Sequence, residues 1–192
     1  MPKRVAIFIS GSGSNMVTIV KAMQSGSINA IPVIVISNNE AAAGIQKARG
    51  LGVATAIISN KLFNGNRSLF EKEIQNVLIQ HKVDIICLAG FMRILTHSFI
   101  KKWHNKILNI HPSLLPKYKG LHTHQRALDA KDSHGGCSVH IVTSELDGGP
   151  VLGQKAVAIY PNDTSDDLSA RVLLEEHRLY QEVLAKFFQD YD

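Results

Sequence analysis

Residues 4–15 read RVAIFISGSGSN, and this stretch decides the fold. Residues 4–10 form the near-continuous apolar run that is typical of a buried parallel strand. Residues 11–15 alternate glycine with small polar side chains, which suits a tight turn and lets the backbone approach a ligand closely. A helical pattern follows to about Ser25. A strand, a glycine loop and a helix in this order indicate the first unit of an α/β protein.

The same alternation continues along the chain. Further strands are predicted at 31–37, 53–58, 84–90 and 106–111, and helices at 41–51, 68–81 and 96–103. Strands that alternate with helices predict a Rossmann-like, mostly parallel twisted sheet with helices on both faces.

The pattern changes towards the C-terminus. Residues 136–143 and 151–160 read as strands joined by a short turn at 147–150, so we expect antiparallel strand pairing there. A long last helix begins at Thr164. Thr164 and Asp167 have the spacing of a capping box, with Asp in place of the usual Glu or Gln.

Composition indicates an ordinary soluble globular domain. The chain has 192 residues, of which 45% are hydrophobic and 19% charged, and we expect residues 1–192 to form a single domain. No signal peptide and no apolar run of membrane-spanning length is recognisable, so a cytoplasmic protein without a membrane partner is expected. Cys87 and Cys137 lie in apolar segments, which favours buried free thiols and a reducing compartment over a disulfide.

The charge pattern limits the kinds of partner. The formal net charge is +5, but the Lys and Arg residues are scattered and form no long basic block. Nucleic-acid binding is therefore not expected. An anionic small-molecule substrate fits a mildly basic protein equally well.

The glycine loop between the first strand and the first helix is a candidate phosphate site. It contains Gly11, Ser12, Gly13, Ser14 and Asn15. A helix N-terminus offers unpaired N–H groups and the positive end of its dipole to an anion. The loop is not a Walker motif or a complete dinucleotide fingerprint, and the alternative is a tight turn without a ligand.

The stretch at 108–120, LNIHPSLLPKYKG, carries two polar residues in an apolar strand. Asn109 and His111 share one face, roughly 6.5 Å apart along the strand, and Pro112 ends it. This is the carboxyl end of the strand, where open parallel sheets bind their ligands. Both side chains could therefore reach one small substrate. The alternative is a histidine that bonds only to a loop carbonyl.

Asp147 lies on a glycine turn just after a predicted strand. An Asp-Gly sequence is commonly no more than a turn. If this carboxylate meets His111, it would orient the imidazole and favour its charged form.

Three further histidines and one glutamate need an interpretation. His122, His124 and His140 do not have a common zinc-ligand spacing, so no metal is expected. Glu176 lies on an otherwise apolar stripe of the last helix, and it lies either at the edge of that stripe or in a site.

Together these motifs resemble a known family. Residues 10–15, 88–95, 108–116, 120–124 and 145–150 resemble the phosphoribosylglycinamide formyltransferases, the folate-dependent glycinamide ribonucleotide transformylases of purine synthesis. The similarity covers nearly the whole chain in order. The 108–116 motif also occurs in other formyltransferases, so it marks the chemistry more than the substrate.

The resemblance implies an activity and its site residues. The formyl group of 10-formyltetrahydrofolate, a co-substrate, would pass to the amine of 5′-phosphoribosylglycinamide without a metal. The implied catalytic residues are Asn109, His111 and Asp147. The implied ribonucleotide-binding residues are Gly11, Ser12, Gly13, Ser14, Asn15 and Glu176. The implied folate-binding residues are Arg67, Met92, Arg93, Ile94, Leu95, Asn109, Thr143 and Asp147.

The resemblance also divides the domain into a phosphate-binding half, 1–105, and a catalytic and folate-binding half, 106–192. We expect small-molecule partners only, and a monomer or weak homodimer. The alternatives are methionyl-tRNA formyltransferase and formyltetrahydrofolate hydrolase, which share a similar core but carry an extra domain, and a nucleotide-binding module without catalysis. No extra domain is expected, since Met1 lies just before the first strand and Asp192 ends the last helix.

Overall fold

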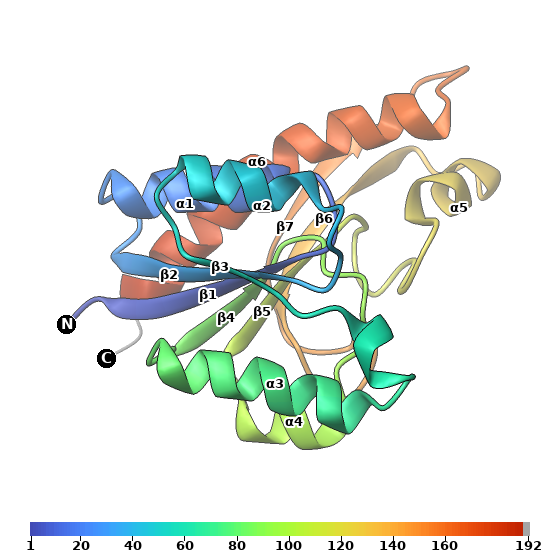
Figure 1. Ribbon diagram of the computed structural model, residues 1–192. Helices are drawn as coiled ribbons and strands as arrows, with labels where there is room; N and C mark the ends of the chain where they lie inside the picture. Colours follow the sequence, from blue (N-terminus) through green and yellow to red (C-terminus); the bar gives the residue numbers. More distant parts are fainter. Residues whose placement is uncertain (190–192) are drawn as a thin grey trace.

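The computed structural model describes residues 1–189, which form one mixed seven-stranded sheet in the order β3-β2-β1-β4-β5-β6-β7 (Figure 1). The strands are β1 (Lys3–Ile9), β2 (Ala30–Ser37), β3 (Thr55–Ile57), β4 (Ile85–Leu88), β5 (Ile107–His111), β6 (His134–Ile141) and β7 (Val151–Ala158). The first five strands pair in parallel, while β6 and β7 pair antiparallel. This confirms the predicted fold class.

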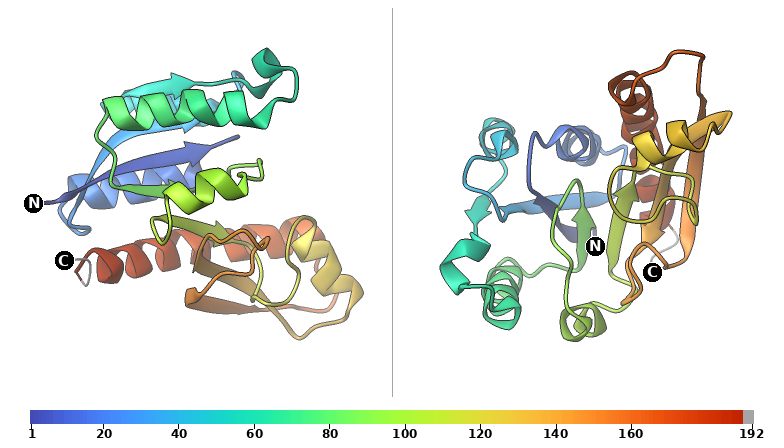
Figure 2. Two further views of the ribbon diagram at one scale, coloured as in Figure 1. Left: turned by 90° about the horizontal axis from the view of Figure 1, so that it is seen from below. Right: turned by 90° about the vertical axis from the view of Figure 1, so that its right-hand side faces the viewer.

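Helices cover both faces of the sheet (Figures 1 and 2). The helices are α1 (Ser14–Gln24), α2 (Ala43–Gly50), α3 (Arg67–Gln80), α4 (His97–Lys102), α5 (Thr123–Asp129) and α6 (Ser165–Gln189), with a short 3-10 helix η1 (Asn60–Phe63). Helices α1, α2 and α6 pack on one face, and α3 and α4 pack on the other. Each face therefore has its own hydrophobic cluster. The expected helix end at Asp192 lies outside the described residues.

The strand order reverses direction between β1 and β4, which makes this the topological switch point of the sheet. The loops that follow these two strands lie side by side. Ser10 N donates to Gly90 O at 3.0 Å, and Met92 N donates to Ser10 Oγ at 2.7 Å. A ligand that binds in the crevice outside the strand ends would contact both loops.

Helix α6 is attached to the sheet through Tyr180. This residue is fully buried, and its hydroxyl lies 3.1 Å from Leu88 O and 3.2 Å from Leu108 O. The carbonyls belong to β4 and β5, so one side chain connects the last helix to both strands. Within residues 1–189, no helix combines the length and the apolar composition needed to cross a membrane.

The N-terminus of α6 is held by two polar contacts. Thr164 N donates to Asp167 Oδ2 at 2.9 Å and Asp167 N donates to Thr164 Oγ1 at 3.2 Å, which confirms the predicted capping box. Arg171 forms a bidentate pair with Asp163 at 2.8 and 2.9 Å. The hydrogen bonds from Arg171 and from Tyr160 N lower the pKa of Asp163 to about 2.

This depressed pKa predicts how Asp163→Asn changes stability. The ion pair contributes fully above the pKa of an unfolded Asp, about 3.9, and the contribution is lost as pH falls through about 2. Asp163→Asn should lower the urea midpoint at pH 7, and the gap to wild type should close between pH 4 and pH 2. Asp166→Asn, an exposed neighbour, is the control. A gap of constant size across this range would contradict the assignment.

Candidate active site

The glycine loop after β1 is packed against the start of α2. Gly44 N donates to Gly11 O at 3.0 Å. A Cβ on Gly44 would lie 2.5 Å from Ile9 Cδ1, and a Cβ on Gly13, whose φ is +69°, would lie 2.8 Å from Gly44 Cα. The loop conformation therefore requires glycine at 13 and at 44. The sequence analysis missed Gly44, because its contact is with a loop far away in the chain.

A cleft of about 260 Å³ opens above this loop. It is bounded by the two loops at the switch point and is lined by Ser10, Gly11, Ser12, Gly13, Ser14, Asn15, Ala89, Gly90 and Met92. Helix α1 begins at Ser14 and points its N-terminus towards the cleft. Lys47 Nζ donates to Ser12 O at 2.9 Å, which brings a positive charge to the rim. The geometry suits an anionic group.

Glu176 is buried and is not at the exposed edge of the apolar stripe. Its side chain is buried, and Asn15 Nδ2 donates to its Oε2 at 2.6 Å. Burial raises the pKa of this carboxyl, against the lowering effect of the Asn15 hydrogen bond. Asn15 Oδ1 is buried and has no hydrogen-bond partner among residues 1–189. The first and last helices thus meet in a polar contact beside the cleft.

Asn109 on β5 faces His140 on β6, since the two residues are register partners in the antiparallel pair. Asn109 Nδ2 lies 3.1 Å from His140 Nε2. His140 Nδ1 lies 3.0 Å from Ile141 O, so this nitrogen carries a proton and donates. Nε2 can accept at most one amide hydrogen of Asn109, so at least one amide hydrogen stays free for a substrate.

Asp147 joins the two histidines. Its Oδ2 lies 3.5 Å from His111 Nδ1 and its Oδ1 lies 3.5 Å from His140 Nε2. Gly120 N donates to Oδ2 at 2.9 Å. Burial raises the pKa of Asp147, but hydrogen bonds with His140 and Gly120, together with the charges of the two histidines, bring it below the usual value. Asp147 thus meets His111, the contact that the sequence left conditional, and it contacts His140 as well.

The loop that carries Asp147 takes an indirect path. Strand β6 is antiparallel, so its last residue, Ile141, pairs with Leu108 at the beginning of β5. Residues 142–150 must fold back to bring Asp147 to His111. Gly149 allows this return, because a Cβ there would lie 1.9 Å from Ile141 O.

The second ring nitrogen of His111 is also occupied. His111 Nε2 lies 3.0 Å from the backbone carbonyl oxygen of Tyr118. The ring therefore contacts a loop carbonyl and an aspartate at once, so the alternative of a histidine that bonds only to a loop carbonyl is wrong.

The expected folate-binding residues differ in exposure. Met92 and Ile94 are 63% and 61% exposed, which is unusual for large apolar side chains. Leu95 is buried in the cluster under α3 and α4. Arg67 is exposed at the first turn of α3, while the side chains of Arg93 and Thr143 are half-buried.

Four other candidate groups, two histidines and two cysteines, differ in burial. His122 is exposed, and burial lowers the pKa of His124, with a smaller contribution from His111. Cys87 and Cys137 are buried free thiols, and burial raises the pKa of each to about 12, which makes them poor nucleophiles. Among residues 1–189, no three His, Cys, Asp or Glu side chains are grouped as metal ligands would be.

The fold and the site together define a formyl transferase: the sequence model of the family described as "Formyl transferase" matches residues 3–184. The phosphoribosylglycinamide formyltransferase of Escherichia coli is 42% identical over 183 residues, which is 95% of this chain and 86% of that protein. The crystal structure of the enzyme of that name from Brucella melitensis has a TM-score of 0.93 and 48% identity, and the match covers 98% of this chain and 96% of that one.

A longer relative also matches. The trifunctional purine biosynthetic protein adenosine-3 of Bos taurus is 46% identical over 94% of this chain, but the chain spans only 18% of that protein. This chain therefore belongs to the formyl transferase family and, within it, to the phosphoribosylglycinamide formyltransferases.

Gly44→Ala should disturb the glycine loop, because the new methyl group overlaps Ile9 and the loop backbone. We expect a loss of about 1 to 3 kcal/mol in unfolding free energy from overpacking, and weaker protection of the loop amides in hydrogen exchange. Gly50→Ala, in the same helix with nothing within 4 Å of its new Cβ, is the control. Equal behaviour of the two variants would contradict the packing argument.

Proposed function

We propose that this protein transfers the formyl group of 10-formyltetrahydrofolate to the glycinamide amine of 5′-phosphoribosylglycinamide, a step of purine synthesis. The observation that carries the proposal is the convergence of Asn109, His111 and Asp147 at the end of β5. Family membership and the adjacent phosphate-type loop support it.

The acceptor would bind at the switch point. Its phosphate would lie on the N–H groups of residues 11–15, next to the N-terminus of α1 and the Lys47 ammonium. Glu176 would accept hydrogen bonds from the ribose hydroxyls, since its carboxylate is held by Asn15 beside that loop. This placement directs the glycinamide amine towards Asn109.

The folate would lie on the other side of the reacting centre. Exposed Met92 and Ile94 offer an apolar surface to the pterin and benzoyl groups, and Arg67 and Arg93 offer positive charge to the glutamate carboxylates. Leu95 is buried, so it would contribute through its backbone. Thr143 and Asp147 lie on the loop that folds back over β5 and β6.

The chemistry is a direct transfer. The amine attacks the formyl carbon, a C–N bond forms, and the carbonyl oxygen gains a negative charge. Asn109 donates its free amide hydrogen to this oxygen, and the charged ring of His111, held between Asp147 and Tyr118 O, stabilises it. The intermediate then collapses, its bond to folate N10 breaks, and the proton lost by the amine passes to N10 through His111 or a water.

The first experiment mixes the protein with both substrates and follows tetrahydrofolate release, with a parallel sample that omits the ribonucleotide. Release only in the complete mixture is the expected result. Release in both samples would identify a hydrolase. No release in either, from folded protein, would favour a nucleotide-binding module without catalysis.

Asn109→Ala and His111→Ala should each reduce kcat by about 10²- to 10³-fold, the range observed when one oxyanion donor is removed. The KM for each substrate should change little, because these groups act mainly on the charge that develops in the transition state. His104→Ala, an exposed histidine between α4 and β5, is the control. Normal turnover by His111→Ala would end this assignment.

Glu176→Gln should raise the KM for the ribonucleotide by about 10- to 100-fold, the usual value of hydrogen bonds to a charged group. The KM for the folate should not change, because Glu176 lies on the phosphate side of the site. Glu175→Gln removes a neighbouring carboxylate on the same helix and serves as the control. A rise in the folate KM alone would place the acceptor elsewhere.

A further inference from the structure

The two nitrogens of the His111 ring face two acceptors. Nδ1 lies 3.5 Å from the Asp147 carboxylate, and Nε2 lies 3.0 Å from the Tyr118 carbonyl oxygen. A carbonyl oxygen only accepts hydrogen bonds, so Nε2 carries a proton in this arrangement. The carbonyl of Tyr118 thereby keeps a proton on Nε2 and fixes the orientation of the ring.

The backbone that presents this carbonyl is not in a relaxed conformation. Tyr118 has a φ of +55°, in the left-handed region that residues with a Cβ seldom adopt. Such a conformation persists only when its surroundings enforce it. Contacts of the Tyr118 side chain and of the turn before it hold the residue in this conformation.

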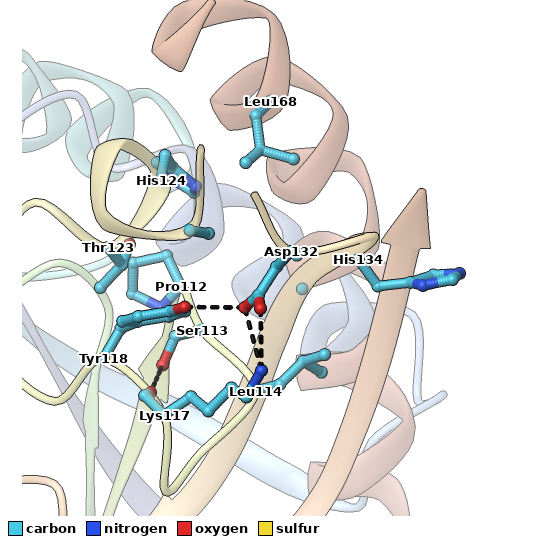
Figure 3. Close-up of a pocket in the computed structure, with 13 residues that line it drawn as sticks. Pro112, Ser113, Leu114, Lys117, Tyr118, Thr123, His124, Asp132, His134 and Leu168 are labelled. Atoms are coloured by element: carbon cyan, nitrogen blue, oxygen red, sulfur yellow. Dashed lines mark hydrogen bonds and ion pairs between the residues drawn. The ribbon is translucent and has the colours of Figure 1, made fainter. Parts of the chain in front are cut away.

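The Tyr118 side chain is held on several sides, as Figure 3 shows in part. Its hydroxyl donates to Asp132 Oδ2 at 2.7 Å, and Lys117 Nζ lies 3.0 Å from both oxygens of the same carboxylate. The guanidinium of Arg126 lies 5.2 Å from the ring centroid, within cation–π range. Asp132 thus anchors both the ring and its neighbour.

The turn before Tyr118 is closed by a separate contact. Ser113 is buried, and its hydroxyl donates to Lys117 O at 2.6 Å, the carbonyl directly before Tyr118 (Figure 3). The cavity between these groups measures only about 10 Å³, so the side chains have little room to rearrange. The segment is therefore held at its side chain and at its backbone.

We propose that Tyr118 is a positioning residue for His111: Asp132 holds the Tyr118 hydroxyl, and the Tyr118 carbonyl in turn holds the Nε2–H of His111. This deepens the proposed function and rests on it, because it explains how the ring reaches the protonation and orientation that formyl transfer needs. Tyr118 and Asp132 touch no reacting atom. Their effect passes through one backbone carbonyl.

The proposal can be tested in the ligand-free protein with ¹⁵N-labelled histidine. Wild type should give a protected imidazole Nε2–H cross-peak, assigned by its loss in His111→Gln. Tyr118→Phe and Asp132→Ala should each broaden or remove this cross-peak. Tyr160→Phe is the matched control, since Tyr160 also lies over an arginine, Arg171 at 4.6 Å, but is remote from His111.

The formyl-transfer kinetics of the same variants provide a second test of the positioning role. Tyr118→Phe should lower kcat by about 3- to 10-fold, the value of one hydrogen bond, with both KM values unchanged. The Tyr118→Phe, Asp132→Ala double variant should be no worse than Asp132→Ala alone, because both changes remove the same contact. Asp132→Asn, which keeps an acceptor oxygen for the hydroxyl, should restore most of kcat and the cross-peak.

The results distinguish failure of the positioning role of Tyr118 from failure of the proposed formyl transfer. An unchanged cross-peak in Tyr118→Phe and Asp132→Ala would overturn the positioning role, whatever their activity, and so would a wild-type spectrum without a protected Nε2–H. The cross-peak is read without substrate. A wild type with the cross-peak but no formyl transfer would therefore support the positioning of His111 and end the proposed function instead.

Discussion

The site depends on one buried hydroxyl. Tyr180 OH is shared by the carbonyls of Leu88 and Leu108, so it connects the last helix to the two strands whose ends border the reaction centre. Glu176 lies one turn before Tyr180 on the same buried face of α6. The anchor therefore sets the height of Glu176 above the sheet and lets it meet Asn15. The buried apolar side chains of α6, among them Val172, Leu179 and Leu184, hold the helix in the same position.

The reacting centre follows a similar principle, because each polar side chain is held by a neighbour from another element. Asn109 on β5 faces His140 on β6, and Asp147 on the returning loop faces both histidines. Preorganised dipoles of this kind need not reorient as charge develops during the reaction. Buried polar groups that are fully partnered also stabilise a single arrangement of the core. In the proposed function, the same contacts therefore serve both stability and catalysis.

Much of this could be predicted from the sequence, and the limits have physical causes. The alternation of strands and helices, and the shared face of Asn109 and His111, follow from local periodicity. The pairing of His140 with Asn109 could not be predicted from local periodicity, because it depends on the register of β6 against β5. The contact between the Tyr118 carbonyl and His111 could not be predicted either, because Tyr118 has a positive φ that no local sequence motif indicates. Leu69 has the spacing of an apolar helix face with Ile74 and Leu78, but it is half exposed and Phe70 is buried instead.

The contact between Asn15 and Glu176 joins residues that are 161 positions apart. Every part of the phosphate loop is synthesised early, whereas its acidic partner comes from α6 near the end of the described chain. A nascent chain on the ribosome thus exposes an incomplete pocket for most of its translation. In the proposed function, the acceptor site is therefore complete only once α6 has docked, so completion of the fold and the onset of acceptor binding coincide.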